Sequence, residues 1–308
     1  MHISDGTENA VVMCVDQGYL PFALFMAEQL DRFENSRNFD ICLISDDVLS
    51  IPQEFSSLGI RVFGPVDDPD YLRLTPSHLP RSTYLRLWAP RILAKHYRKA
   101  IYLDADMFIE GAGLSGVFGT DLGRRAIGAV RDVQQWYRPR RNPAEFRNAG
   151  LPSTPYFNAG MLLIDCARYE ELRIMEKCLD IAKTQPGLVR HHDQSLLNIA
   201  LKGDWTELPP IWNWQWSMKY PLFTDWTGPR IHHFIGETKP WNDAHGYSPR
   251  RFHMAYAAFF ARHFPDRAAS MPAPGPSPLQ DWKRSAWLSL RFWALRRKLL
   301  RYLSTFPA

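Results

Sequence analysis

Two carboxylates that follow an apolar run are the first candidates for metal chemistry in this chain. Asp104 and Asp106 come directly after the apolar residues 101–103. In an extended backbone, side chains at positions i and i+2 point to the same side. Two adjacent carboxylates repel each other unless a cation lies between them, and hard oxygen ligands suit Mg²⁺ or Mn²⁺. The alternative is a turn at a strand end, where Asp is a common residue.

A second polar group surrounds the end of the apolar residues 231–235. A histidine at this strand end, His232 or His233, can complete an oxygen-rich metal site. Gly236 lets the backbone approach a ligand, and Lys239 can meet phosphate oxygens as a point charge. The alternative is a buried structural histidine and a surface lysine.

Two further polar groups stand at the ends of predicted elements. Asp193 and Gln194 open a predicted helix, where Asp193 would be the N-cap if the pair were only structural. Ala159 and Gly160 lie in a predicted strand and leave room for a planar or sugar-sized group. A bulge at Gly160 is the structural alternative. Each group alone is a weak signal of function.

Short apolar strands alternate with helical patterns through most of the chain. Strands are predicted at 11–15, 41–45, 61–66, 100–103, 126–130, 155–164 and 230–235, and helices around 24–30 and at 81–98, 169–183, 193–201 and 252–263. This alternation is typical of a parallel sheet that helices cover on both faces, an α/β fold. Open sheets of this kind place ligands beyond the carboxyl ends of their strands. Asp16 and Asp46 stand at two such ends.

Five motifs follow one another in a fixed order. They are STYLRL at 82–87, YLDAD at 102–106, YFNAG at 156–160, DQ at 193–194 with Asn198, and HxxGxxKPW at 233–241. Together they resemble glycosyltransferase family 8 over about residues 10–245, and five ordered motifs are far more specific than one DxD triplet. The resemblance implies the GT-A fold, which is Rossmann-like with a mostly parallel central sheet flanked by helices. It also implies a retaining, metal-dependent transferase similar to the bacterial lipopolysaccharide glucosyl- and galactosyltransferases.

The resemblance implies a metal site and a nucleotide-sugar site. Asp104, Asp106 and His233 would hold Mn²⁺ (or Mg²⁺), which binds the diphosphate of a UDP-sugar. The ion would stabilise the charge that develops on the leaving UDP. The implied contacts to the nucleotide-sugar are Asp16, Tyr19, Arg86, Asp104, Ala105, Ala159, Gly160, Gly236 and Lys239. Gly18 stands where the family usually has Asn, so the chain departs from the pattern at one nucleotide contact.

The resemblance also implies catalytic residues around the donor hexose. They are Asp132, Asn158, Asp193 and Gln194. Carboxylate and amide groups suit vicinal hydroxyls because they accept and donate hydrogen bonds in pairs. Since a neutral amide is a poor nucleophile, we expect the acceptor to attack on the face that the phosphate leaves, with Gln194 steadying the oxocarbenium-like centre. Ser195 stands where relatives often have an acid, which further disfavours a carboxylate nucleophile there.

Two segments allow either a structural or a functional interpretation. The stretch 138–148 is rich in Arg, Pro and Asn. It is either a surface loop, or a lid or acceptor wall that meets anionic sugars or phosphates. The aromatic run 212–216 either stacks on sugar rings or packs in the core.

The excess positive charge is confined to the C-terminus. The chain has 308 residues and a net charge of +5, but residues 281–308 contain seven Lys or Arg and one Asp. The remainder is therefore close to neutral. A nucleic-acid-binding domain is typically basic over one face, so we expect no nucleic-acid partner. Residues 265–280 form a predicted Pro/Ala-rich spacer.

Residues 282–303 predict a basic amphipathic helix. Its apolar stripe consists of Leu288, Phe292, Leu295, Leu299 and Leu303, accompanied by tryptophans. The pattern suits a helix that lies on an anionic membrane surface. The alternative is a helix that docks on the protein through this stripe. We therefore expect a GT-A catalytic domain at 1–264, a spacer at 265–280 and a membrane-associating tail at 281–308.

These features together predict a function and a location. No apolar stretch approaches about 18 residues, and the first Lys or Arg is Arg32, unlike a secretory signal. We expect a cytoplasmic protein, peripheral on the inner face of the cytoplasmic membrane, whose scattered cysteines are reduced thiols. It would transfer glucose or galactose from a UDP-hexose to a hydroxyl of a lipopolysaccharide or other lipid-linked oligosaccharide. The alternatives are a same-fold transferase for a soluble or protein acceptor, a non-catalytic nucleotide-sugar-binding protein, and a metal phosphohydrolase with Asp193 as base.

Overall fold

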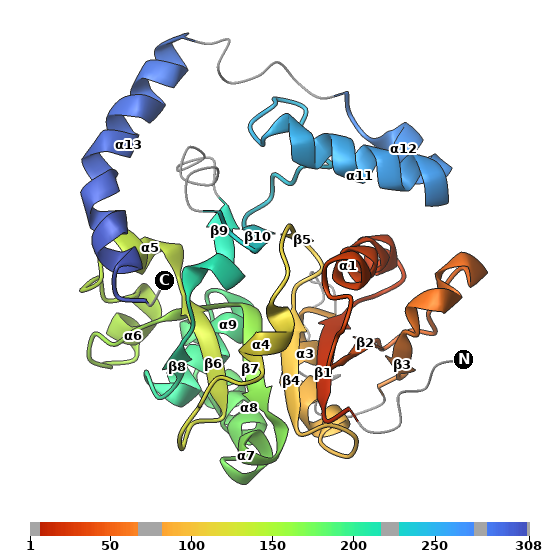
Figure 1. Cartoon of the computed structure of the whole chain (residues 1–308). Helices are drawn as coiled ribbons and strands as arrows, with labels where there is room; N and C mark the ends of the chain where they lie inside the picture. The colour runs from red at the N-terminus through yellow and green to blue at the C-terminus, as the bar shows by residue number, and fades with distance from the viewer. Residues whose placement is uncertain (1–6, 67–81, 217–227, 274–281, 307–308) are drawn as a thin grey trace. The chain divides into compact units, whose positions relative to one another are not determined.

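The chain divides into two compact units. The computed structural model describes residues 7–66, 82–216, 228–273 and 282–306 (Figure 1). Unit 1 comprises residues 1–105 and 112–208, and unit 2 comprises residues 106–111 and 209–308. The chain thus passes into unit 2 directly after Ala105, in the middle of the DxD triplet.

Unit 1 contains a seven-stranded sheet in the order β3-β2-β1-β4-β7-β6-β8. The strands are β1 (Asn9–Cys14), β2 (Asp40–Ile44), β3 (Arg61–Phe63), β4 (Lys99–Leu103), β6 (Ile127–Arg131), β7 (Phe157–Asp165) and β8 (Thr206–Glu207). β7 runs antiparallel to its neighbours β4 and β6, and the other pairings are parallel. The predicted α/β fold with a mostly parallel sheet is confirmed.

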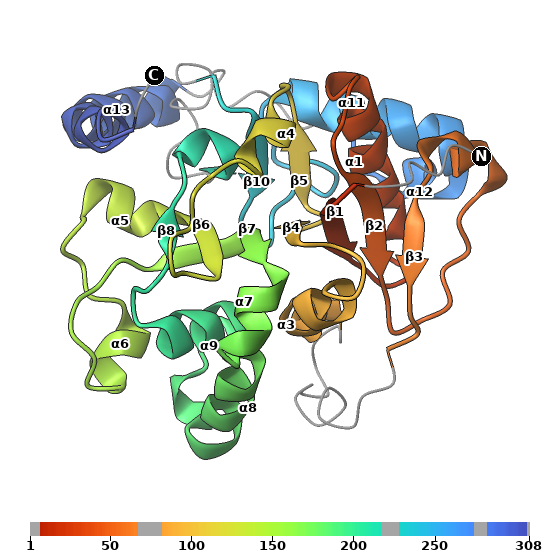
Figure 2. The ribbon, with the colours of Figure 1, turned by 60° about the horizontal axis from the view of Figure 1, so that its bottom comes forward.

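Both faces of this sheet are buried. The helical segments of unit 1 are α1 (Leu20–Phe33), η1 (Gln53–Leu58), α3 (Ser82–Leu93), α4 (Leu114–Val117), α5 (Val133–Tyr137), α6 (Ala144–Asn148), α7 (Cys166–Glu171), α8 (Ile174–Thr184), η2 (Pro186–Leu188) and α9 (His192–Leu201). Figure 2 shows α3, α7, α8 and α9 together on one face. Ala10 and Val12 belong to the core on that face, and Val11 and Met13 are equally buried. Successive strand side chains point to opposite faces, so β1 is covered on both sides.

Several predicted elements have different bounds in the structure, for example the strand predicted at 61–66, which is β3 at Arg61–Phe63. Three of the differences have a local cause. The helix predicted at 169–183 is two helices, α7 and α8, because Arg173 between them has a left-handed φ of 52° that a helix cannot contain. The predicted strand 155–164 begins at Phe157, since Pro155 has no N–H for the sheet. The predicted helix 81–98 ends at Leu93, whose carbonyl accepts from His96 and Tyr97 in a turn.

Unit 2 contains a three-stranded sheet in the order β5-β10-β9. Its elements are β5 (Met107–Ile109), η3 (Pro210–Trp212), β9 (Trp214–Trp216), β10 (Ile231–Phe234), α11 (Arg250–His263), α12 (Pro265–Ser270) and α13 (Trp282–Leu303). The ring of Tyr256 on α11 packs 6.5 Å from that of Phe234, and its hydroxyl donates to the Met107 carbonyl. α11 therefore packs against β5, the strand that follows the DxD triplet, and β10, the strand in which the HxxGxxKPW motif begins, in one core.

Two open questions from the sequence concern unit 2. Trp214 and Trp216 are buried, so the aromatic run favours the core interpretation. The predicted spacer begins with a helix, α12, rather than an extended segment, because Pro265 occupies a first-turn position where its missing N–H costs nothing. Residues 274–281 of that spacer lie outside the described residues. The predicted domain bounds stay a prediction.

The predicted C-terminal helix is present as α13, with the bounds expected from the sequence. Its exposed large apolar side chains among the described residues are Trp287, Leu290, Trp293 and Leu300, which are 49%, 73%, 66% and 37% exposed. Leu299, a member of the predicted apolar stripe, is fully buried instead. Among the described residues, no helix is both long and apolar enough to cross a bilayer. The four cysteines are buried and unpaired by disulfides.

Candidate metal and donor site

The carboxylate of Asp106, in unit 2, is in close contact with a histidine and a lysine. One carboxylate oxygen lies 3.3 Å from Nε2 of His233 on β10, and the other lies 2.6 Å from Nζ of Lys239. Burial alone would raise the pKa of the Asp106 carboxyl, but Lys239 and His233 lower it well below the usual range. Asp106 is therefore ionised at physiological pH and can act as a ligand.

Asn213 orients His233. The Asn213 side-chain oxygen lies 3.0 Å from Nδ1 of His233, and both residues are buried. Because an amide oxygen only accepts, Nδ1 carries a proton, and Nε2, on the side of Asp106, is the nitrogen that can bind a metal ion. Metal-binding histidines are oriented in this way by a partner on the second ring nitrogen. The sequence analysis did not identify Asn213, because only the tryptophans around it stood out.

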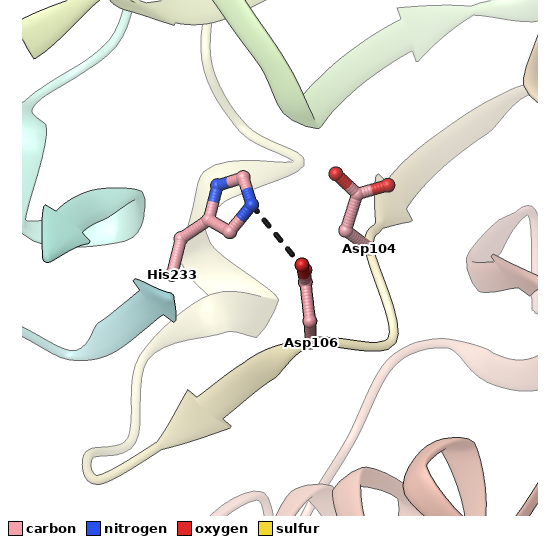
Figure 3. A group of neighbouring side chains, drawn as sticks. All are labelled: Asp104, Asp106 and His233. Atoms are coloured by element: carbon pink, nitrogen blue, oxygen red, sulfur yellow. Dashed lines mark ion pairs between the residues drawn. The ribbon is translucent and has the colours of Figure 1, made fainter. Parts of the chain in front are cut away.

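Asp104 joins this pair through the covalent chain, since only Ala105 separates it from Asp106. One ligand atom from each of Asp104, Asp106 and His233 lies within 4.8 Å of the others (Figure 3). Oδ1 of Asp106 is buried with no hydrogen-bond donor among the described residues. A buried carboxylate oxygen without a donor is costly unless a cation approaches it. Two carboxylates and an imidazole are ligands that suit Mn²⁺, so the residues present fit the predicted ion.

Gly236 and Lys239 follow β10 in the same unit. Gly236 has a φ of 89°, a value that other residues rarely adopt, so its place in the motif has a backbone reason. The Lys239 ammonium donates to the Phe234 carbonyl as well as to Asp106. Its charge therefore lies beside the candidate metal ligands, where a bound diphosphate would need a counter-charge.

Arg86 of α3 connects the predicted donor residues of unit 1. Its guanidinium lies 2.8 Å from Asp104 and 2.6 Å from Asp193, and it donates to the carbonyl of Ala159. The guanidinium also stacks on the ring of Tyr102, whose hydroxyl donates to Asp104. Only the planar fork of arginine can make these contacts at once. Arg86 is 9% exposed and fixes both carboxylates.

Asp193 lies in the first turn of α9 but does not cap it. His191 occupies the N-cap position, and the Asp193 carboxylate pairs with Arg86 instead. The carboxylate is almost completely buried. Burial raises the pKa of Asp193 to about 6; Arg86 opposes this rise and Asp104 adds to it.

The Gln194 side chain contacts β7 beside an irregularity of that strand. The register of β7 against β6 shifts between Ala129 and Val130, which are opposite Leu162 and Asn158, so the strand is irregular around Gly160. The Gln194 side-chain oxygen accepts hydrogen bonds from the Asn158 amide and from the Ala159 N–H. Because this oxygen already accepts two hydrogen bonds, it is poorly placed to attack a sugar. The structure thus brings Asn158, Ala159, Gly160 and Gln194 together.

Asp132 lines a pocket of about 420 Å³ within unit 1. Its carboxylate caps α5 by accepting from the N–H of Gln134. Gln194 lines the same pocket, as does Glu145, a buried carboxylate that the sequence analysis did not identify. The only sequence signal for Glu145 was its position in the Arg-rich stretch 138–148.

The predicted nucleotide contacts Asp16 and Tyr19 lie together after β1. The Asp16 carboxylate accepts from the N–H of Tyr19, and the Tyr19 side chain is exposed. A Cβ at position 18 would lie 3.2 Å from the Asp16 carboxylate. This tight turn explains why Gly18 suits the position where the family usually has Asn.

Replacement of Asn213 by Ala is expected to weaken Mn²⁺ binding about 10- to 100-fold, because His233 loses the group that fixes its tautomer and ring orientation. The measurement is the free Mn²⁺ signal in electron paramagnetic resonance during titration of the protein. Asn148→Ala, at an exposed position on α6, is the matched control. Equal Mn²⁺ affinity in both folded variants would refute a role for Asn213.

Solved structures share this fold. The galactosyltransferase LgtC in complex with donor and acceptor sugar analogs is similar with a TM-score of 0.63 at 21% identity, over 86% of this chain and 96% of that chain. The apo form of GlyE from Streptococcus pneumoniae is similar with a TM-score of 0.55 at 23% identity, over 88% of this chain and 66% of that chain. At these identities the likeness establishes the fold, and the predicted GT-A fold is confirmed.

Curated relatives match most of the chain in sequence. Glycosyltransferase GlyF of Streptococcus pneumoniae is 32% identical over 249 residues, which are 76% of this chain and 57% of that protein. Lipopolysaccharide 1,2-glucosyltransferase of Escherichia coli K12 is 27% identical over 178 residues, or 53% of this chain and 49% of that protein. The chain thus spans about half the length of these relatives.

The family profile covers the whole candidate site. The profile described as "Glycosyl transferase family 8" matches residues 10–245. This range includes Asp16 at the first strand, the DxD triplet, Gln194 and the motif that ends at Trp241. With both groups of candidate ligands inside the match and the fold shared, the chain belongs to glycosyl transferase family 8.

Proposed function

We propose that the protein transfers a hexose from a UDP-sugar to a hydroxyl of an oligosaccharide, with a divalent metal ion and with retention at the anomeric carbon. The observation that carries this proposal is the group of Asp104, Asp106 and His233 with the Lys239 ammonium beside it. A metal ion there would supply charge stabilisation for the departing diphosphate. Mn²⁺ is the ion we favour for this set of oxygen and nitrogen ligands.

The residues of the chain have distinct tasks in this proposal. Asn213 keeps the lone pair of His233 available, and Lys239 offers a positive charge to the phosphate oxygens. Arg86 holds Asp104 and Asp193 in place. Asp193 and the neighbouring Asn158, Asp132 and Gln194 would bind hydroxyls of the donor hexose. All these groups are fixed by contacts within their own unit, which favours preorganisation.

The transfer step needs no nucleophile from the protein. The acceptor oxygen forms its bond to the anomeric carbon on the face where the bond to the phosphate oxygen breaks. The hydroxyl proton of the acceptor passes to the leaving phosphate. Gln194 supports this route, because a neutral amide oxygen that already accepts a hydrogen bond from the N–H of Ala159 is a poor nucleophile.

We propose glucose or galactose as the hexose and a lipopolysaccharide or other lipid-linked oligosaccharide as the acceptor. This choice is supported by the name of the E. coli relative, a lipopolysaccharide glucosyltransferase, and by that of LgtC, a galactosyltransferase. An acceptor of this kind would place the enzyme at the inner face of the cytoplasmic membrane.

The tail is proposed to bind an anionic membrane surface through α13. Its exposed tryptophans, Trp287 and Trp293, each have an arginine over the ring, Arg291 and Arg296 respectively. Aromatic rings with adjacent cations suit the boundary between lipid head groups and acyl chains. The exposed face differs from the stripe predicted from the sequence, because Leu299 of that stripe is buried.

The double variant Trp287→Ser/Trp293→Ser is expected to bind phosphatidylglycerol-containing vesicles at least about tenfold more weakly, because each buried aromatic side chain contributes about 1.5–3 kcal/mol. Co-sedimentation with vesicles measures the affinity. Val48→Ser/Met254→Ser, which removes two exposed apolar side chains elsewhere, is the control. If both double variants bind like the wild type, the tail does not act through these tryptophans.

UDP release from a panel of UDP-sugars tests the proposed function. The panel contains UDP-glucose, UDP-galactose and UDP-N-acetylglucosamine, each with Mn²⁺ or with a chelator. We expect release from one UDP-hexose that depends on Mn²⁺. If no sugar nucleotide is turned over and no metal effect is seen, the chain is not a transferase of this kind.

A further inference from the structure

The pocket next to Asp132 and Gln194 has a basic rim. Four side chains at its edge are exposed and cationic or able to become so: Arg141, Arg147, Arg190 and His191. All lie in unit 1, as does every other residue that lines the pocket. The proposed function uses Asp132 and Gln194 but gives no task to this rim.

Hydrogen bonds and ring packing hold the chain segment that carries part of the rim. Gln135 is buried, and its amide donates to the carbonyls of Arg141 and Thr154 while its oxygen accepts from the N–H of Tyr156. It therefore ties together the two ends of the segment between α5 and β7. The buried ring of Phe146 on α6 packs 5.5 Å from the Tyr156 ring. Part of the segment 138–148 thus lines the pocket and is held in place by these contacts.

Among the described residues, Arg147 and Arg190 of the rim form no ion pair with a carboxylate, whereas Arg141 interacts electrostatically with Asp132 and His191 lies 3.6 Å from Glu145. Arg86, Arg91 and Arg131 of the same unit each form ion pairs with carboxylates. In the part of the chain that the structure describes, neither Arg147 nor Arg190 lies within ion-pair distance of any carboxylate, and the same holds for Arg141. The Arg147 guanidinium donates one N–H to the Asn142 carbonyl. The remaining N–H groups of such an arginine at a cavity can bind an anionic oxygen pair.

The floor of the pocket has the opposite character. Glu145 is 3% exposed and accepts hydrogen bonds from the hydroxyls of Tyr156 and Ser195. With Asp132 it gives the floor two carboxyl groups. Carboxylates repel an anion but accept hydrogen bonds from neutral sugar hydroxyls. An anion could therefore bind at the rim but not at the floor.

We propose that this pocket is an acceptor subsite for a saccharide that carries a phosphate or carboxylate group. The neutral ring hydroxyls of the acceptor would lie at Glu145 on the floor, next to the donor contacts Asp132 and Gln194, and the anionic group would bind the arginines of the rim. This inference rests on the proposed transfer function and adds the charge of the acceptor to it. Phosphate and carboxylate share the paired oxygens that arginine binds, so the experiment compares the two.

Equilibrium binding of three related sugars to the full chain tests the proposal. The probes are glucose, glucose 6-phosphate and glucuronate, titrated by ligand-observed NMR with UDP and Mn²⁺ at saturation so that the nucleotide part of the donor site is filled. We expect at least one anionic probe to bind about tenfold or more tightly than glucose, since a hydrogen bond to a charged group contributes about 1.5–3 kcal/mol. The anionic probe with the larger gain in affinity over glucose identifies whether the rim prefers phosphate or carboxylate.

Variants localise the effect to the rim. Arg147→Gln and Arg190→Gln are each expected to lose about tenfold of the affinity for the anionic probe. Arg140→Gln removes an exposed arginine of the same segment that does not line the pocket, and should retain it. The proposal is overturned if all three sugars bind alike, or if Arg140→Gln loses as much as Arg190→Gln.

Binding of UDP to the same samples tests the proposed transfer function independently of the acceptor subsite. If the chain binds UDP with Mn²⁺ but binds the three sugars with equal affinity, only the acceptor proposal is wrong. If the chain does not bind UDP, the proposed transfer function is wrong. The sugar titrations without UDP then still show whether the rim binds an anionic sugar more tightly than glucose.

Discussion

Asp106→Asn is expected to lower kcat/KM for UDP release at least about 10³-fold, which corresponds to about 4 kcal/mol of transition-state stabilisation. The substitution keeps the shape of the side chain but removes the charge that pairs with His233 and Lys239. A neutral amide is a much weaker ligand for a divalent ion than a carboxylate. The Lys239 ammonium would also lose its partner and draw the phosphate oxygens into a different position. Initial rates at several Mn²⁺ concentrations measure the effect.

The control for this variant is Asp180→Asn, an exposed carboxylate on α8. It should keep wild-type activity, and thermal unfolding should show that both variants are folded. If Asp106→Asn is folded and retains most of the wild-type rate at the same Mn²⁺ concentration, Asp106 does not bind a catalytic ion.

Arg86→Met is expected to lower the free energy of unfolding by about 3–5 kcal/mol, the usual effect of removing one partner from a buried ion pair. Asp193 is 3% exposed and would keep a buried charge with no cation beside it. Asp104 would lose a contact of 2.8 Å and with it part of its orientation. Urea denaturation measures the loss. Arg91→Met on the same helix is the control, because its ion pairs are about a third exposed and such pairs contribute less than about 1 kcal/mol.

The loss of unfolding free energy caused by Arg86→Met should increase as the pH rises. In the wild type, burial raises the pKa of Asp193 to about 6, so the folded chain binds this proton more tightly than the unfolded chain does. The contribution of the carboxyl to stability is therefore complete below about pH 4 and is lost as the pH rises to about 6. Removal of Arg86 removes the charge that lowers this pKa, so the loss continues above pH 6. The destabilisation by Arg86→Met should accordingly be larger at pH 8 than at pH 5.

A second variant separates the charge effect from lost packing. Arg86→Met/Asp193→Asn should recover part of the stability and lose the pH dependence, because no buried carboxylate remains at position 193. If Arg86→Met costs no more than Arg91→Met, or if its cost does not change with pH, the buried pair does not have the energetic role assigned to it.

The sequence was sufficient for features that depend on local chain geometry. Asp104 and Asp106 follow an apolar strand, and their spacing of two residues already predicts that they act together. Asp16 lies after β1 as the alternation of strands and helices indicated. The order of motifs then connected these positions with Gln194 and Lys239, which are far away along the chain.

Other site residues could not be found in this way, because their roles arise only in the folded chain. Asn213 matters through its contact with His233, twenty positions later in the chain. Glu145 becomes part of a cavity only when α6 packs beside α9 and against the ring of Tyr156. The break at Arg173 was missed because a left-handed φ is unusual for any residue other than Gly.

The amphipathic tail shows a related limit. Helical periodicity identified α13 correctly, but periodicity does not state which apolar face is covered. Leu299 of the predicted stripe is buried, whereas Trp287 and Trp293 are exposed. Burial depends on what else packs beside the helix, and no pattern within 22 residues contains that information.

Calorimetric titration of the full chain with UDP, in Mn²⁺ and in a chelator, tests the central claim most directly. It requires neither the correct sugar nor an acceptor, and it examines the ligands Asp104, Asp106 and His233 through the diphosphate that they are proposed to bind. The account predicts binding of UDP with Mn²⁺, loss of that binding in the chelator, and no metal effect in Asp106→Asn. Binding of UDP with equal affinity in Mn²⁺ and in the chelator would contradict the account, because the diphosphate would then not depend on a metal ion at this site.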